Sequence, residues 1–344
     1  MRRPQLCYAV LQWCAMGRWW IALIALPWAV AGPYTLYTCG SNAKEYVVGA
    51  RLPPSGIFTR GADGGWRHVG FTHPSITAFD FDPRDPGVVY AAAGNGLLRV
   101  TNGGERWKIL TGSDVTELLD VTVDRNAPGT IYFSHTHGIQ VSRDGGVTWR
   151  DASSGLRRKY TAAVRVDSRR AGILLAGTEQ GIFRSEDGGQ SWKLAGAAGI
   201  QVLHLEQSPH DACYWLAATE GSGLFASSDC GISFESSGNL GVGLNLYDIA
   251  FDPAVANRVA VAGWGTGVAI SEDRGKSWQP RNAGLPSANV WSVIFDPTQP
   301  GRLFAGVHEE AVYVSAGIGR AWAKDGLEGC SIFRMKFVPE APRQ

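Results

Sequence analysis

Short apolar segments alternate with turn residues along most of the chain. Between residues 76 and 100, an apolar segment leads into an Asp-Pro turn, a second apolar segment ends in alanine and glycine, and a third follows a tight turn. The same order returns at residues 246–270 and 290–314. Short apolar runs bounded by Gly, Pro, Asn and Asp are typical of β-strands joined by tight turns. We therefore predict an all-β protein.

A repeated motif follows the third segment of each unit. It reads SRDGGVTW at residues 142–149 and ends in an aromatic residue. Related copies read VTNGGERW (100–107), SEDGGQSW (185–192), SSDCGISF (227–234) and SEDRGKSW (271–278), and weaker copies end in Trp66 and Trp322. Successive terminal aromatics are 41 to 44 residues apart. Seven copies of a unit with four short strands predict a seven-bladed β-propeller with four-stranded antiparallel blades.

The ends of the chain predict how the ring closes. The first unit, from residue 45, has a second, a third and a fourth strand but no first strand, and residues 331–338 match the missing strand. We predict a propeller over residues 45–338 whose C-terminal strand completes the first blade, with a linker at 32–44 and a tail at 339–344. Closing the ring in this way removes the open sheet edge that would invite pairing with another chain.

The N-terminus differs from the rest of the chain in composition. Residues 19–31 are apolar and follow Arg18, and no charged residue occurs between them and Lys44. This length suits the apolar region of a secretory signal and is short for a bilayer span. We expect residues 1–31 to be a cleaved signal peptide or a membrane anchor, with Met16 as an alternative start. The protein is then exported (periplasmic, extracellular or lumenal), or held at the membrane by residues 19–39.

Charge and cysteine content narrow the function classes. The net charge is +1 and no long lysine or arginine run occurs, so the electrostatic footprint of a nucleic-acid surface is missing. An exported protein enters an oxidising compartment in which cysteines can pair. Cys213 opens the second strand of a unit, and Cys230 replaces the first glycine of the motif in the same unit. Both positions belong to one face of one blade, so a disulfide between them is geometrically reasonable.

The repeated motif resembles the Asp-box, also called the BNR repeat, over residues 45–338. Propellers of this superfamily occur in sialidases, xyloglucan-degrading endoglucanases, sortilin-type receptors and photosystem II assembly factors. These functions differ widely, so the resemblance implies the fold and not the chemistry. In size and single-ring build, the chain is most similar to the assembly-factor propellers. In the resembling enzymes, the active site lies on the propeller face opposite the Asp-boxes.

The residues of the motif suit a structural turn. Ser142 and Asp144 can accept hydrogen bonds from the backbone, the glycines supply positive φ, and Trp149 begins the next strand facing the core. An active site is normally built once per ring, whereas this motif is built seven times. We assign the same structural role to the remaining motif residues. These are Asn102, Gly104, Trp107, Gly146, Ser185, Asp187, Gly189, Trp192, Ser227, Asp229, Gly231, Phe234, Ser271, Asp273, Gly275 and Trp278.

The first strand of each unit carries the main candidates for ligand binding. Its middle position is apolar in every unit and the flanking positions are often charged, which places the charged set toward the central channel. Two interpretations remain open: a solvated or mutually paired polar channel, or a ligand-binding mouth. The mouth would use Asp120, Arg165, His204, Glu206, Asp248 and Arg334.

Loops on the face opposite the motif add further candidates. Trp264 stands between glycines and could be a platform for a sugar or a partner, or a packed loop residue. The run Arg157, Arg158 and Lys159 is a basic patch suited to an acidic partner, or a merely solvated loop. His135 and His137 could bind a metal, but no third ligand is close in sequence, so we expect neither metal nor cofactor. The same turns also carry Glu179, Glu220, His308, Glu309 and Glu310.

We expect a monomeric ring that binds a protein or a carbohydrate on the face opposite the motif, as an assembly scaffold without catalysis. The alternative is a sialidase-like or xyloglucanase-like glycoside hydrolase with its carboxylates on that same face. Asp120 and Asp248 are the carboxylate pair that this alternative would use. The sialidase arginine motif is not matched, because the corresponding region reads GIFTR without a proline.

Overall fold

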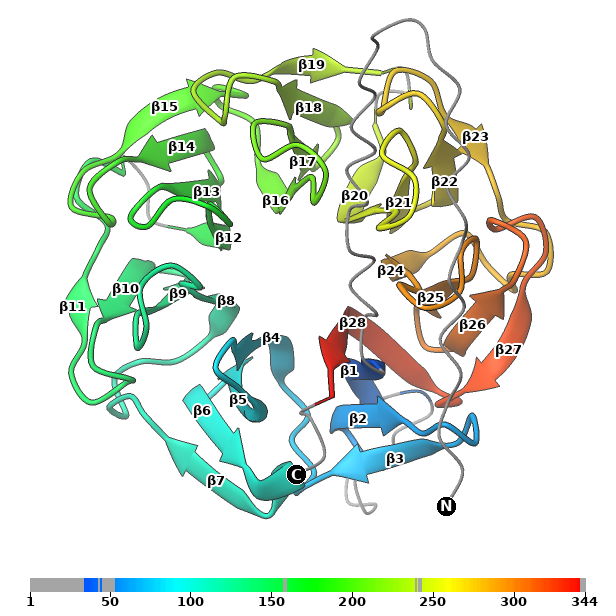
Figure 1. Ribbon diagram of the computed structural model, residues 1–344, viewed down its shortest axis with the longest axis horizontal. Coiled ribbons are helices and arrows are strands. Elements are labelled where there is room, and N and C mark those ends of the chain that lie inside the picture. The colour runs from blue at the N-terminus through cyan, green and yellow to red at the C-terminus, as the bar shows by residue number, and fades with distance from the viewer. Residues whose placement is uncertain are drawn as a thin grey trace, which may run out of the picture. The chain divides into compact units, whose positions relative to one another are not determined.

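A computed structural model describes residues 34–42, 44, 53–156, 160–238, 240 and 243–340. These residues belong to one compact unit and form seven four-stranded antiparallel sheets, the blades of a ring (Figure 1). The predicted seven-bladed β-propeller is therefore confirmed. Among the described residues, no helix is long and apolar enough to cross a membrane. The predicted signal or anchor at residues 1–31 lies outside the described residues.

Each blade contributes one strand to each of four concentric layers. The innermost strands are β4 (Ile76–Asp82), β8 (Leu118–Val123), β12 (Thr161–Val166), β16 (Val202–Gln207), β20 (Asn245–Phe251), β24 (Val290–Phe295) and β28 (Cys330–Pro339). The second layer holds β5 (Asp85–Ala93), β9 (Ile131–His135), β13 (Leu174–Thr178), β17 (Trp215–Thr219), β21 (Val259–Trp264), β25 (Leu303–Val307) and β1 (Tyr34–Asn42).

The two outer layers complete the blades. The third strands are β6 (Gly96–Thr101), β10 (Gly138–Ser142), β14 (Gly181–Ser185), β18 (Leu224–Ser227), β22 (Gly267–Ser271), β26 (Ala311–Ser315) and β2 (Gly56–Arg60). The outermost strands are β7 (Arg106–Ile109), β11 (Arg150–Asp151), β15 (Lys193–Gly196), β19 (Glu235–Ser237), β23 (Gln279–Pro280), β27 (Ala323–Gly326) and β3 (Trp66–Val69). A 3-10 helix, η1 (Asn102–Gly104), joins β6 to β7.

The closing blade combines both ends of the propeller, in the order β28-β1-β2-β3. The C-terminal strand pairs with β1 from Tyr34↔Pro339 to Asn42↔Cys330, so the predicted ring closure is confirmed. The predicted boundary at residue 45 is wrong, because the second strand of this blade is β1, which ends at Asn42. Residues 34–42 of the predicted linker are therefore a strand: β1 supplies the ladder between β28 and β2, and residues 45–52 lie outside the described residues.

Hydrophobic clusters hold neighbouring blades together. In one of them, Tyr90 and Leu97 of one blade pack with Leu118 and Phe133 of the next. A single blade would expose apolar side chains on both faces, and packing against its neighbours removes this surface from water. Tryptophans that end the repeated motif add a hydrogen bond across the same boundary. The Trp149, Trp192 and Trp322 indole N–H groups donate to the carbonyls of Leu110 (3.0 Å), Ala152 (2.7 Å) and Arg281 (2.6 Å) in the preceding blade.

The repeated motif forms a hydrogen-bonded turn between the third and fourth strands. The Ser142 hydroxyl accepts the Gly146 N–H (2.8 Å) and donates to Asp144 (2.7 Å). The Asp144 carboxylate accepts the N–H groups of Val147 (3.0 Å) and Thr148 (2.9 Å). The same serine-to-aspartate bond occurs in the copies that begin at Ser185, Ser227 and Ser271. We call these four the Ser-x-Asp turns.

The disulfide predicted from the sequence is present. It joins Cys213 to Cys230, and the Cys230 N–H also donates to the Cys213 carbonyl (3.0 Å). Cys230 stands at a positive φ of 66°, at a position where two other Ser-x-Asp turns have glycine and the third has Arg274. The left-handed conformation is unfavourable for residues other than glycine, and the cross-link offsets this cost in the folded chain.

Candidate functional site

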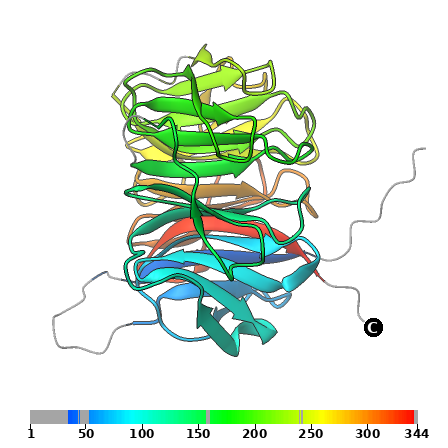
Figure 2. The same ribbon diagram turned by 90° about the vertical axis from the view of Figure 1, so that its left-hand side faces the viewer.

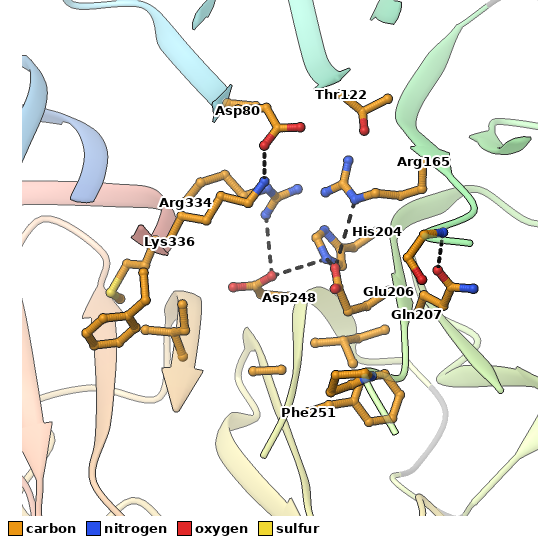
Figure 3. Close-up of a pocket in the computed structure, with 18 of the residues that line it drawn as sticks. Asp80, Thr122, Arg165, His204, Glu206, Gln207, Asp248, Phe251, Arg334 and Lys336 are labelled. Atoms are coloured by element: carbon orange, nitrogen blue, oxygen red, sulfur yellow. Dashed lines mark hydrogen bonds and ion pairs between the residues drawn. The ribbon is translucent and has the colours of Figure 1, made fainter. Parts of the chain in front are cut away.

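The innermost strands surround a polar cavity of about 440 Å³ in the central channel (Figure 3). The predicted alternation along these strands is correct. Middle residues such as Val164 and Leu205 are buried between blades, whereas the flanking charged residues line the cavity. Asp120, Arg165, His204, Glu206, Asp248 and Arg334 are all brought together there, with Asp80 and Lys336.

Acids and bases pair across the cavity. The Lys336 ammonium lies 2.5 Å from the Asp80 carboxylate, and Arg165 forms an ion pair with Asp120. Arg334 donates to the Tyr247 carbonyl (3.1 Å) and lies 3.8 Å from Asp248. The cations of this cavity are thus largely neutralised by its own carboxylates, as in the interpretation of a mutually paired channel.

Three of the carboxylates also connect neighbouring blades. Asp120 accepts the N–H of Val164 on the next inner strand (3.0 Å), and Asp248 accepts the N–H of Val293 (3.0 Å). Asp80 does the same with Val123 (2.8 Å). Asp120 and Asp248, the pair considered for glycoside hydrolysis, therefore already hold backbone groups of the ring in place.

His204 and Glu206 are less completely satisfied. The His204 side chain is buried, its Nε2 lies 3.4 Å from both Glu206 and Asp248, and neither ring nitrogen has a hydrogen-bond partner among the described residues. Burial, together with the positive charge of Arg334 and Arg165, lowers the pKa of His204 well below its usual value, so the imidazole is neutral. Burial raises the pKa of Glu206 to about 7 and that of Asp248 to about 6. Such groups can exchange hydrogen bonds and protons with a small polar molecule.

The cavity lies toward the face that carries the Ser-x-Asp turns. Its wall continues into the turns after the inner strands, at Arg125, Ser168 and Pro253. Those turns contact the Ser-x-Asp turns, because the Gly145 N–H donates to the Gly129 carbonyl (2.9 Å). The charged channel residues thus do not form a binding site on the opposite face, where the site was predicted from the sequence. Figure 2 shows the strands running between the two faces, so each inner strand presents different residues to each end of the channel.

Aromatic side chains gather at the other end of the channel. Tyr247, Trp291 and Phe333 come from inner strands, Trp264 ends the second-layer strand β21, and His308 lies in the turn after β25; we call these five residues the aromatic cluster. The Trp291 ring lies 4.3 Å from Tyr247, 5.8 Å from Phe333 and 6.2 Å from Trp264. Trp264 lies 5.0 Å from His308 and is 40% exposed.

Trp264 and His308 were predicted from the sequence as candidate site residues, whereas the other members of the aromatic cluster were not. Tyr247, Trp291 and Phe333 each lie at a register shift, where the inner strand has one residue more than its partner. A β-bulge changes the direction in which a side chain points. A simple two-residue alternation therefore assigns these positions to the wrong face of the strand. The available signal was the bulky aromatic immediately before a channel position in three successive units.

The remaining predicted site residues are not part of either group. Arg157, Arg158 and Lys159 lie outside the described residues. His135 and His137 are near each other, with ring centroids 5.8 Å apart. Across the described part of the chain, no group of three or more His, Cys, Asp or Glu residues is arranged to hold a metal ion.

Comparison with known proteins supports the fold. No protein-family model and no curated protein matches the chain. Among solved structures, a GH74 enzyme of Niastella koreensis aligns with a TM-score of 0.67 at 18% identity, over 84% of this chain and 52% of the enzyme. The GH74 xyloglucanase of Xanthomonas campestris gives 0.61 at 16% identity, over 85% of this chain and 56% of the enzyme. This chain thus spans about half the length of those enzymes.

A second kind of structural relative is closer to this protein in size. YCF48 of Cyanidioschyzon merolae aligns with a TM-score of 0.59 at 16% identity, over 77% of this chain and 89% of its own. A structure described as YCF48 bound to D1 peptide gives 0.57 at 18% identity, over 73% and 82%. At these identities, the similarity shows a shared propeller fold and does not assign an activity.

Proposed function

We propose that this protein is an exported or membrane-tethered propeller that binds a protein or a glycan without catalysing a reaction. The observation that carries the proposal is the aromatic cluster, which includes a tryptophan that is 40% exposed. Exposed, ordered aromatic rings contribute much of the binding energy at interfaces, because they bury a large area at a small cost in conformational entropy. We propose that the partner binds at this cluster, on the face opposite the Ser-x-Asp turns, and that the ring acts as a monomer.

The geometry of the carboxylates argues against the alternative of a glycoside hydrolase. Such an enzyme needs two carboxyl groups that face each other across the substrate, one of which must donate a proton. Asp120 and Asp248 instead accept backbone N–H groups from neighbouring blades. The feature that still favours an enzyme is Glu206, whose pKa is raised to about 7 by burial, a value suited to a general acid.

A screen of the purified protein against aryl glycosides and xyloglucan separates these functions. We expect no turnover above that of the buffer. Turnover that is lost in Asp120→Asn, Asp248→Asn or Glu206→Gln, while the protein remains folded, would establish the hydrolase instead. N-terminal sequencing of the exported protein tests the proposed signal: a mature chain that begins near Gly32 supports cleavage, and a chain that retains residues 19–31 supports an anchor.

Binding is tested by capturing partners on the immobilised protein. Trp264→Ala should lower capture, because the most exposed ring of the cluster is lost. Val147→Ala is the matched control: Val147 is an exposed apolar residue (79%) within a Ser-x-Asp turn, on the other face. A separate variant with Arg157, Arg158 and Lys159 changed to alanine tests whether the basic loop contributes to the same partner. Capture that survives Trp264→Ala unchanged would move the binding surface away from the aromatic cluster.

A further inference from the structure

Most ring pairs of the aromatic cluster are inclined to one another at large angles, whereas Trp291 and Tyr247 are inclined by 30°. Trp264 makes an angle of 67° with Trp291 and 55° with His308, and Trp291 makes an angle of 80° with Phe333. A sugar ring stacks on one flat aromatic face, whereas a positive charge is attracted to the face of every ring within about 6 Å of it. Inclined rings therefore favour a cation over a stacked sugar.

Hydrogen bonds fix the orientation of two of these rings, Trp291 and His308, before any ligand binds. The Trp291 indole N–H donates to His308 Nδ1 (2.9 Å), and the Ser331 hydroxyl lies 2.9 Å from the same nitrogen. The Ser331 hydroxyl in turn accepts the Glu309 N–H (3.0 Å). With Nδ1 acting as an acceptor, a neutral His308 carries its proton on Nε2, which lies 3.9 Å from the Glu309 carboxylate. A preorganised cluster loses little side-chain entropy when it binds.

Acidic residues flank the aromatic cluster on two sides. A continuous row of backbone pairs crosses three blades at this face, from Glu220 through Asn245, Trp264 and Asn289 to His308. Glu220 stands at one end of the row and Glu309 follows His308 at the other end. Glu220 is exposed to solvent, and Glu309 is half-buried with its side chain 46% exposed. The neighbouring Glu310 is neutralised by Lys44 at 2.9 Å, so Glu220 and Glu309 supply the negative charge beside the rings.

We propose that the aromatic cluster binds a lysine or arginine side chain presented by an extended segment of a partner polypeptide. This inference rests on the proposed function of a partner-binding propeller and names the chemistry of the partner. The cation contacts the faces of Trp264 and Trp291, and Glu309 and Glu220 complement its charge and that of basic residues next to it along the segment. The site is distinct from the charged cavity, whose cations already have carboxylate partners at the other end of the channel.

The test uses the exported full-length protein and two peptides of the form Gly-X-Gly-X-Gly with blocked ends, in which X is arginine or glutamine. Binding is followed by tryptophan fluorescence and by calorimetry. The arginine peptide should bind at micromolar to millimolar concentration, more weakly as salt rises, and about tenfold more tightly than the glutamine peptide. Trp264→Ala should weaken binding by about 5–30-fold, and Glu309→Gln by up to about 5-fold. Val147→Ala should leave binding unchanged.

Three results would overturn the inference. They are an absence of saturable binding up to millimolar arginine peptide, equal affinity for the two peptides, and unchanged affinity of Trp264→Ala for the arginine peptide. If the protein binds a xyloglucan oligosaccharide and Trp264→Ala abolishes this binding, the ligand of the aromatic cluster is a glycan and not a cation. The proposed function of a binding propeller would then still hold. Glycoside turnover that depends on Asp248 would instead refute the proposed function itself, so the two failures are distinguishable.

Discussion

Replacing Asp120 with alanine should destabilise the ring by about 3–4 kcal/mol. The Asp120 carboxylate accepts the N–H groups of Val121 (2.9 Å) and Val164 (3.0 Å), and Asp120 is 1% exposed. Alanine leaves both donors without an acceptor, at about 1 kcal/mol each. Arg165 also loses its partner. Because the Arg165 side chain is 19% exposed to the channel, we take about 1–2 kcal/mol for this loss rather than the value of a fully buried pair.

Urea denaturation followed by tryptophan fluorescence measures this change, and thermal melting should show a decrease in Tm of at least ~6 °C. Asp120→Asn keeps an acceptor but loses the charge, so an intermediate decrease is expected. Thr122→Ala is the control, because it trims a channel-lining side chain of the same strand and leaves the bonds of Asp120 intact. If Asp120→Ala melts like the control, the carboxylate does not connect the blades, and the argument against a catalytic Asp120 is lost.

Three further predictions concern the channel, the disulfide and the ring closure. Burial raises the pKa of Glu206 to about 7 from 4.5. Between these two pH values the folded state binds more protons than the unfolded state, so the free energy of unfolding falls as the pH rises. Glu206→Gln should flatten that slope in melts between pH 5 and 8; identical slopes would contradict the assignment. Replacing Cys213 and Cys230 with alanine should lower the free energy of unfolding by about 3 kcal/mol, since the disulfide spans a sequence separation of 17. Reduction of the disulfide in the native protein should produce the same decrease. If the oxidised native protein is no more stable than the double alanine variant, the predicted stabilisation by the disulfide is refuted. A chain that ends at Gly329 lacks β28 and should aggregate or oligomerise on a sizing column; a monomer with an unchanged melt would disprove the closure.

Local patterns predicted most of the fold. Strand number and blade number followed from the spacing of the motif, because each turn is built from residues close in sequence, such as Ser142 and Asp144. The strand β1 was missed for a physical reason. Its partner β28 is some 300 residues away, as in the pair Tyr34↔Pro339, and a short segment of Tyr, Thr and Leu next to an apolar N-terminus gives no local sign of that pairing.

The candidate sites were predicted less completely. Alternation correctly placed Arg165, His204 and Glu206 in the channel, because successive side chains of a strand point to opposite faces of the sheet. Alternation says nothing about which face a cavity opens toward, or which carboxylate reaches a backbone N–H of the next blade. Tyr247 and Trp291 were missed because a β-bulge at each position interrupts the alternation of side-chain direction. Bulges depend on the pairing between strands, which the sequence of one strand does not show.

The pairing of β1 with β28 also sets the order in which the chain can fold. Blades made of consecutive strands, such as β4 to β7, have all their partners once about 40 residues have been synthesised. The strand β1, in contrast, cannot complete its pairing until β28 has been synthesised. During this interval, β1 lacks its inner neighbour, and the apolar face that β28 later covers stays open to solvent. Contacts between distant segments form slowly, and unpaired edges associate with other chains. The pairing of β1 with β28 protects the finished ring from edge pairing. Before that pairing forms, the same strand edge is the place where an incomplete chain is most prone to associate with other chains.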